Sequence, residues 1–99
     1  MSTTNRDQVV SILQSNHAAL QRFEVKSLAL FGSAARNCMR RSSDVDILVQ
    51  FEHSTWANYI GLKITLEDLL GRKVDLVTPK AIRQATRLSI EKDLLYVVS

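Results

Sequence analysis

The sequence predicts a small α/β domain, with a mixed β-sheet and helices packed mainly on one face. Apolar residues recur at helical spacing over residues 5–21 and again in the middle of the chain. Three short runs rich in β-forming residues alternate with these stretches, at 25–31, 44–51 and 73–77. With 99 residues and no repeat or linker, the chain is expected to form one domain, residues 1–99, with a modest core.

The first element is expected to be an amphipathic helix over about residues 5–21. Thr4-x-x-Asp7 resembles a capping box, in which two side chains satisfy free amide groups at the start of a helix. Four apolar residues follow at helical spacing: Val9, Ile12, Leu13 and Leu20. Residues 25–31 then form the first predicted strand.

The next part of the chain is expected to form a short helix, a turn and a second strand. Ser33 can cap a helix over about residues 33–39, where two alanines favour helical backbone. The polar residues 40–43 are expected to turn the chain. Residues 44–51 then form the second predicted strand.

A longer helix is expected to follow Thr55, which can act as its N-cap, and Gly71 can end it in the left-handed conformation. Six apolar or aromatic residues form its stripe: Trp56, Tyr59, Leu62, Leu66, Leu69 and Leu70. We interpret this stripe, including Trp56 and Tyr59, as core rather than as a platform for stacking bases.

The last part of the chain is expected to contain a strand, a helix and a C-terminal segment that is either helix or strand. Residues 73–77 form the third predicted strand. Thr78-Pro79 is a favourable helix start, and the helix is expected to continue through Ile82, Ala85 and Leu88. Residues 94–98 either finish this helix or form a short edge strand, and their Tyr-Val-Val sequence favours the strand.

Three short motifs carry the chemistry of the chain. In Gly32-Ser33, the glycine lets backbone amides approach a phosphate and the serine adds a hydroxyl group. Asp44-x-Asp46 begins a strand, where the period of two directs both carboxylates to one face. If the third strand neighbours the second, its lone carboxylate, Asp75, converges on the same face. Such a cluster of hard oxygen ligands favours Mg²⁺ together with substrate phosphates.

The combined pattern resembles the DNA polymerase beta superfamily of nucleotidyltransferases, and most of all its minimal (MNT) members. It consists of Gly32-Ser33, ten residues, Asp44-x-Asp46 and a later Asp75. The resemblance implies that Gly32 and Ser33 bind the triphosphate of a nucleotide, and that the three aspartates are catalytic and hold Mg²⁺, with two ions expected. It also implies transfer of AMP from ATP to a tyrosine of a HEPN RNase toxin, with this chain as the antitoxin. No residue in the sequence identifies the base or the acceptor.

Two other functions stay open at this point. The first is a non-catalytic partner that binds the toxin or a nucleotide and regulates by occlusion, although a pure binding module has no need of three clustered acids. The second is a transferase directed at RNA, which a basic helix face at Lys80, Arg83 and Arg87 would suit. Arg36 lies one turn after Ser33 and can reach a phosphate. For Arg40 and Arg41 a phosphate contact and a solvated side chain both stay open.

The composition argues against a membrane protein, a secreted protein and a disulfide-bonded protein, but it does not identify a partner. A net charge of +3 is a mild excess that is compatible with nucleotides, RNA or an acidic protein face. Cys38 is the single cysteine, so it has no partner for an intrachain disulfide or a cysteine zinc site. No apolar run is long enough to span a bilayer, and the first residues lack the features of a signal peptide. A cytoplasmic location is therefore expected.

Overall fold

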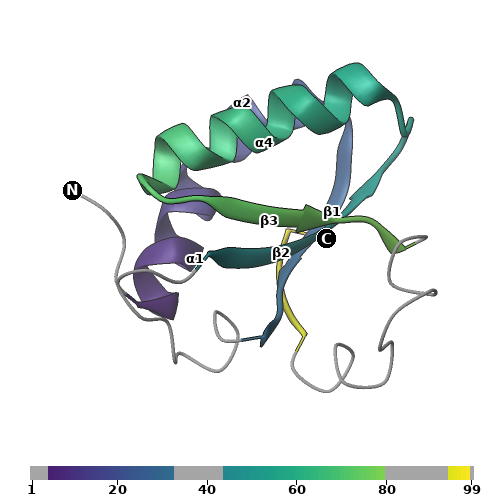
Figure 1. Cartoon of the computed structure of the whole chain (residues 1–99). Coiled ribbons are helices and arrows are strands. Elements are labelled where there is room, and N and C mark those ends of the chain that lie inside the picture. The colour runs from purple at the N-terminus through teal and green to yellow at the C-terminus, as the bar shows by residue number, and fades with distance from the viewer. Residues whose placement is uncertain (1–4, 33–43, 80–93, 99) are drawn as a thin grey trace.

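The computed structural model describes residues 5–32, 44–79 and 94–98 (Figure 1). Its elements are α1 (Arg6–Ser15), α2 (His17–Gln21), β1 (Val25–Leu30), β2 (Val45–Phe51), α4 (Trp56–Leu70), β3 (Val74–Val77) and β4 (Leu95–Val98). In this part of the chain the strands form one sheet of order β3-β2-β1-β4. β1 is antiparallel to both β2 and β4, and β2 is parallel to β3. The predicted mixed α/β sheet and the predicted C-terminal strand are thus confirmed. The helices expected at 33–39 and after Pro79 lie outside the described residues.

The first helix differs from the prediction at its start and in its continuity. Asn5 is the N-cap, since its side-chain Oδ1 accepts the backbone N–H of Gln8 at 2.9 Å; Thr4 lies outside the described residues. Asn16 separates α1 from α2, so the predicted continuous helix over 5–21 is wrong. The Asn16 side chain donates to the carbonyl of Ile12 at 2.8 Å. Such a local bond competes with the helical backbone pattern and favours a break.

Helix α4 begins and ends as predicted. The Thr55 hydroxyl accepts the backbone N–H of Asn58 at 3.1 Å, and Gly71 ends the helix with a φ of 64°. Glycine adopts this left-handed conformation without the steric cost that a Cβ would impose. No helix within the described ranges is long and apolar enough to cross a membrane.

The aromatic residues at the start of α4 divide between core and surface. Tyr59 packs against the core, as predicted. Trp56 is 77% exposed, so its assignment to the core is wrong. Its ring instead stacks on the ring of Tyr59, with centroids 5.8 Å apart and an interplanar angle of 19°. The helical period placed both residues on one stripe, but Trp56 packs on the outer side of Tyr59 rather than on the sheet.

One face of the sheet and the described helices share a single apolar core, and Figure 1 shows α4 lying across this face. The sheet contributes Leu28, Leu30, Val45, Ile47, Val49, Val74 and Leu76, and the helices contribute Val9, Leu13, Leu20, Leu62, Leu66 and Leu70. Because side chains alternate along a strand, residues between these core positions lie on the opposite face. Asp46 and Asp75 are among them.

Side chains of α4 form hydrogen bonds with backbone groups on the outer edge of β3. Glu67 accepts the N–H of Val74 at 3.0 Å, and the Tyr59 hydroxyl donates to the carbonyl of Leu76 at 2.6 Å. β3 is an edge strand in this sheet, and such strands expose unpaired backbone groups unless they are covered. These two bonds therefore fix α4 to β3 and block pairing of another strand at these two groups.

Candidate active site

The parallel pairing of β2 with β3 aligns two of the predicted site residues. Asp46 and Asp75 are direct partners in the register, flanked by the pairs Val45–Val74 and Ile47–Leu76. Neighbouring strands lie about 4.8 Å apart, and side chains at paired positions share a face. The two carboxylates therefore lie side by side on the face of the sheet away from the described helices. The condition set by the sequence, that the third strand neighbour the second, is met.

Gly32 brings the end of β1 against one of these carboxylates. The N–H of the preceding residue, Phe31, donates to the carbonyl of Asp46 at 3.1 Å. Gly32 has a φ of 61°, and a Cβ built on it would lie 2.5 Å from Oδ2 of Asp46. A side chain there would collide with the carboxylate and adopt a disfavoured backbone conformation. Glycine at this position therefore allows the Asp46 carboxylate to approach the backbone that follows β1.

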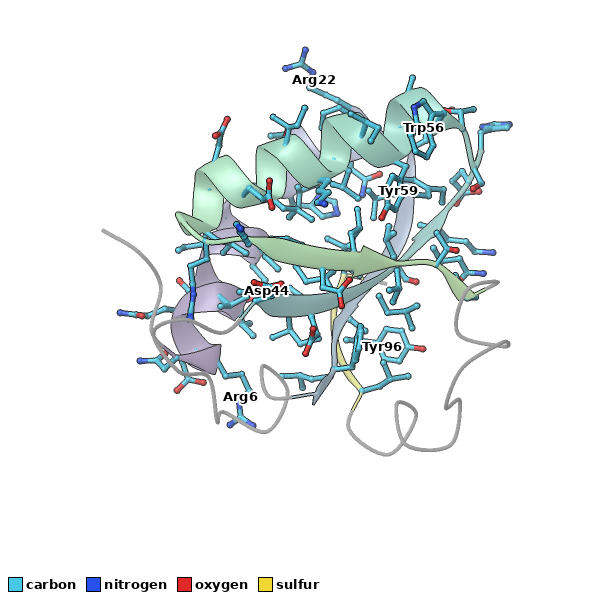
Figure 2. The ribbon with its side chains drawn as sticks, viewed as in Figure 1. Arg6, Arg22, Asp44, Trp56, Tyr59 and Tyr96 are labelled. Carbon is cyan, nitrogen blue, oxygen red and sulfur yellow. The ribbon has the colours of Figure 1, made fainter. Side chains whose placement is uncertain are left out.

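Asp44 lies one residue before β2 and is exposed; Figure 2 shows it at the start of this strand. Across residues 5–32, 44–79 and 94–98, no three His, Cys, Asp or Glu side chains gather closely enough to hold a metal ion by themselves. The aligned pair Asp46–Asp75 nevertheless fits Mg²⁺, which commonly uses one or two carboxylates and completes its shell with water and substrate phosphates. Ser33 and Arg36 lie outside the described residues, as do Arg40, Arg41, Lys80, Arg83 and Arg87.

A hollow that the sequence analysis missed adjoins Asp75. It has a volume of about 510 Å³ and lies between the start of α4 and the end of β3, with Trp56, Tyr59, Asp75 and Thr78 among its lining residues. The signal in the sequence was an aromatic pair three residues apart directly after an N-cap. Helical periodicity assigned this pair to the core and so concealed the hollow.

A polar cluster joins the segment before α4 to the start of β1. The Glu24 carboxylate accepts from Nδ2 of Asn58 at 2.8 Å and lies 2.8 Å from Nδ1 of His53. Hydrogen bonds from Asn58 and then from His53 lower the pKa of Glu24 from its usual value of 4.5. The contact between His53 and Glu24 joins the segment before α4 to the residue before β1.

Two strand carboxylates in register, with one of them close to the backbone of Gly32, form a candidate site for metal-dependent phosphoryl or nucleotidyl transfer on a mixed α/β sheet. The chain belongs to the nucleotidyltransferase domain family, whose model matches residues 10–97. The matched range contains the candidate site positions Gly32, Asp44, Asp46 and Asp75.

Individual relatives share most of the chain. The protein adenylyltransferase MntA of Thermococcus cleftensis is 34% identical over 99 residues, which cover 98% of this chain and 100% of that protein. A solved structure assigned provisionally as a minimal nucleotidyltransferase is 32% identical, with a TM-score of 0.69, and the match covers 87% of this chain and 93% of that one. The complex of the tri-AMPylated Shewanella oneidensis HEPN toxin with its MNT antitoxin contains a chain of the same fold. That match has a TM-score of 0.56 and 20% identity, and covers 89% of this chain and 71% of that one.

Proposed function

We propose that this chain is a magnesium-dependent protein adenylyltransferase that transfers AMP from ATP to a tyrosine hydroxyl of a HEPN toxin and thereby acts as its antitoxin. The observation that carries the proposal is the register pair Asp46–Asp75 beside the backbone of Gly32. The activity named for the Thermococcus cleftensis relative supports protein as the acceptor. The fold shared with the Shewanella oneidensis complex supports a HEPN toxin as the partner.

The reaction requires one bond to form and one to break at the α-phosphorus of ATP. The acceptor oxygen attacks this phosphorus, and the bond from phosphorus to the bridging oxygen breaks, so that pyrophosphate leaves with the electron pair. Asp75 accepts the proton of the acceptor hydroxyl. Gly32 admits the triphosphate to the side of Asp46, and Ser33 and Arg36 are proposed to bind its oxygens. Asp44, Asp46 and Asp75 are the residues proposed to hold Mg²⁺, with two ions expected, and the bound metal would supply charge neutralisation for the leaving pyrophosphate.

The product explains how the transfer would silence a toxin. AMP attached to a tyrosine adds a bulky group with a negative phosphodiester. Close to the active site of an RNase, this group repels the phosphates of the RNA and blocks their access. Binding alone would also block access, so the two modes of inhibition have to be separated by experiment.

The test is intact-mass spectrometry of a cognate HEPN toxin after incubation with this protein, ATP and Mg²⁺. The wild type is expected to add the mass of AMP to the toxin. Asp46→Asn and Asp75→Asn are each expected to slow the transfer at least about a hundredfold while the fold is retained. Asp68→Asn is the matched control, because Asp68 is an exposed aspartate on α4, away from the site. An unchanged toxin mass, with wild type and Asp46→Asn equally protective in cells, would show that the chain inhibits by binding alone.

A further inference from the structure

The hollow at the start of α4 has an aromatic wall and an acidic end. Trp56 is 77% exposed and rests on the ring of Tyr59, while Asp75 lines the same hollow from β3. Figure 2 shows the Trp56 and Tyr59 side chains next to each other at the start of α4. Its volume of about 510 Å³ is in the range of sites that enclose a small organic group.

The aromatic wall is held in place before any ligand arrives. The Tyr59 hydroxyl is bonded to the Leu76 carbonyl at 2.6 Å, which fixes the ring against β3. Trp56 stacks on this fixed ring and follows Thr55, whose side chain caps the helix. A surface that is already ordered loses little conformational entropy when it binds a partner. Exposed tryptophan and tyrosine are also enriched among the residues that dominate protein interfaces.

The in-line arrangement of the attacking and leaving oxygens indicates which of the two substrates binds at this hollow. The attacking and leaving oxygens lie roughly in line on opposite sides of the phosphorus. Along the sheet order β3-β2-β1, Gly32 follows β1, Asp46 is on β2 and Asp75 is on β3. If the pyrophosphate leaves on the Gly32 side, the acceptor oxygen enters from the Asp75 side. Asp75 lines the hollow, which therefore lies on that side.

We infer that the Trp56–Tyr59 hollow is the docking site for the acceptor segment of the partner protein, with an aromatic acceptor side chain received beside Trp56. This inference rests on the proposed function, because it assumes a protein acceptor. It assigns Trp56 to partner recognition and leaves the binding of the nucleotide to the Gly32 side. Trp56 thus acts in positioning the acceptor and not in the chemical step.

The first test uses Trp56 as a spectroscopic reporter, since it is the single tryptophan in the chain. The chain is labelled with 5-fluorotryptophan, so ¹⁹F NMR reports on this ring without interference from tryptophans of the toxin. Adding the HEPN toxin without nucleotide is expected to shift or broaden the resonance. Adding Mg²⁺ and α,β-methylene-ATP alone is expected to leave it unchanged. A response to the nucleotide and none to the toxin would overturn the inference and assign the hollow to the base.

The second test separates the two substrates kinetically. Trp56→Ala is expected to raise the KM for the toxin about tenfold or more, to leave the KM for ATP within about twofold, and to be rescued in large part by Trp56→Phe. Ile64→Ala is the matched control, because Ile64 is also exposed and apolar on α4 but lies outside the hollow. An equal effect of Ile64→Ala, or an unchanged toxin KM in Trp56→Ala, would overturn the inference. If no transfer occurs with wild type, the proposed function fails, whereas the ¹⁹F experiment without nucleotide still decides where the toxin binds.

Discussion

Replacing Gly32 with alanine is expected to damage stability and catalysis by two separate routes. The φ of 61° at Gly32 costs a residue with a Cβ about 1 to 2 kcal/mol. For a domain of this size each kcal/mol lowers the melting temperature by about 4–8 °C, so a fall of about 4–16 °C is expected. In addition, the new Cβ would lie 2.5 Å from Oδ2 of Asp46, and the carboxylate has to move. A displacement of about 1 Å in a reacting constellation can cost about a hundredfold in rate.

Gly71→Ala separates these two routes. Gly71 has nearly the same backbone conformation, with a φ of 64°, but it ends α4 and is not part of the proposed site. Both variants are expected to melt at similarly lowered temperatures in a thermal denaturation series. Only Gly32→Ala is expected to lose AMP transfer, measured well below both melting temperatures. Equal transfer rates in the two variants would show that the close approach of Gly32 to Asp46 does not serve the proposed catalytic role of this carboxylate.

Two further predictions concern the contacts that hold α4 in place. Tyr59→Phe removes the hydroxyl that donates to the Leu76 carbonyl, so the free energy of unfolding is expected to fall by about 1 kcal/mol. Tyr96→Phe is the control, because Tyr96 is exposed, and it should leave the melting temperature unchanged. Equal melting temperatures of the two variants would contradict a stabilising role of the Tyr59–Leu76 bond. The pKa of Glu24 is lowered from 4.5 by hydrogen bonds from Asn58 and then from His53, so the stability gained from its ionised form is present above this value and is lost as the pH falls through the lower, folded-state pKa. The difference in melting temperature between wild type and Glu24→Gln is therefore expected to shrink below pH 4.5, and a difference that stays constant from pH 7 to pH 3 would show that the carboxylate's charge is not involved.

The sequence predicted those features that depend on local pattern. Thr55 and Gly71 mark the ends of α4 because capping chemistry is encoded within a few residues. Asn16 breaks the first helix through a bond to the Ile12 carbonyl, which apolar periodicity does not reveal. Trp56 was assigned to the core because its spacing fits the stripe, although the packing of Tyr59 leaves it outside. Local pattern carries no information about such neighbours.

The candidate site also combines features that the local sequence indicates with features that depend on the pairing of distant segments. The common direction of Asp44 and Asp46 stays a prediction, because Asp44 lies one residue before β2. The alignment of Asp46 with Asp75 depends on strand pairing. The sequence could state this pairing only as a condition. The hollow beside Asp75 is formed by two segments that are distant in the chain, so no single motif describes it. The roles of Ser33 and Arg36 stay predictions.

The register of β2 and β3 links the evolution of the core to the evolution of the active site. Val74 and Leu76 are buried on either side of Asp75, and a slip of β3 by one residue would expose both of them and turn Asp75 into the apolar layer. Each buried aliphatic side chain contributes about 1.5–3 kcal/mol, so the core holds the two carboxylates opposite each other. Substitutions at Val74 or Leu76 that loosen this layer are therefore expected to lower activity, although neither side chain belongs to the proposed catalytic group. Variation at these two positions is expected to be restricted by the geometry of the reaction as well as by the stability of the fold.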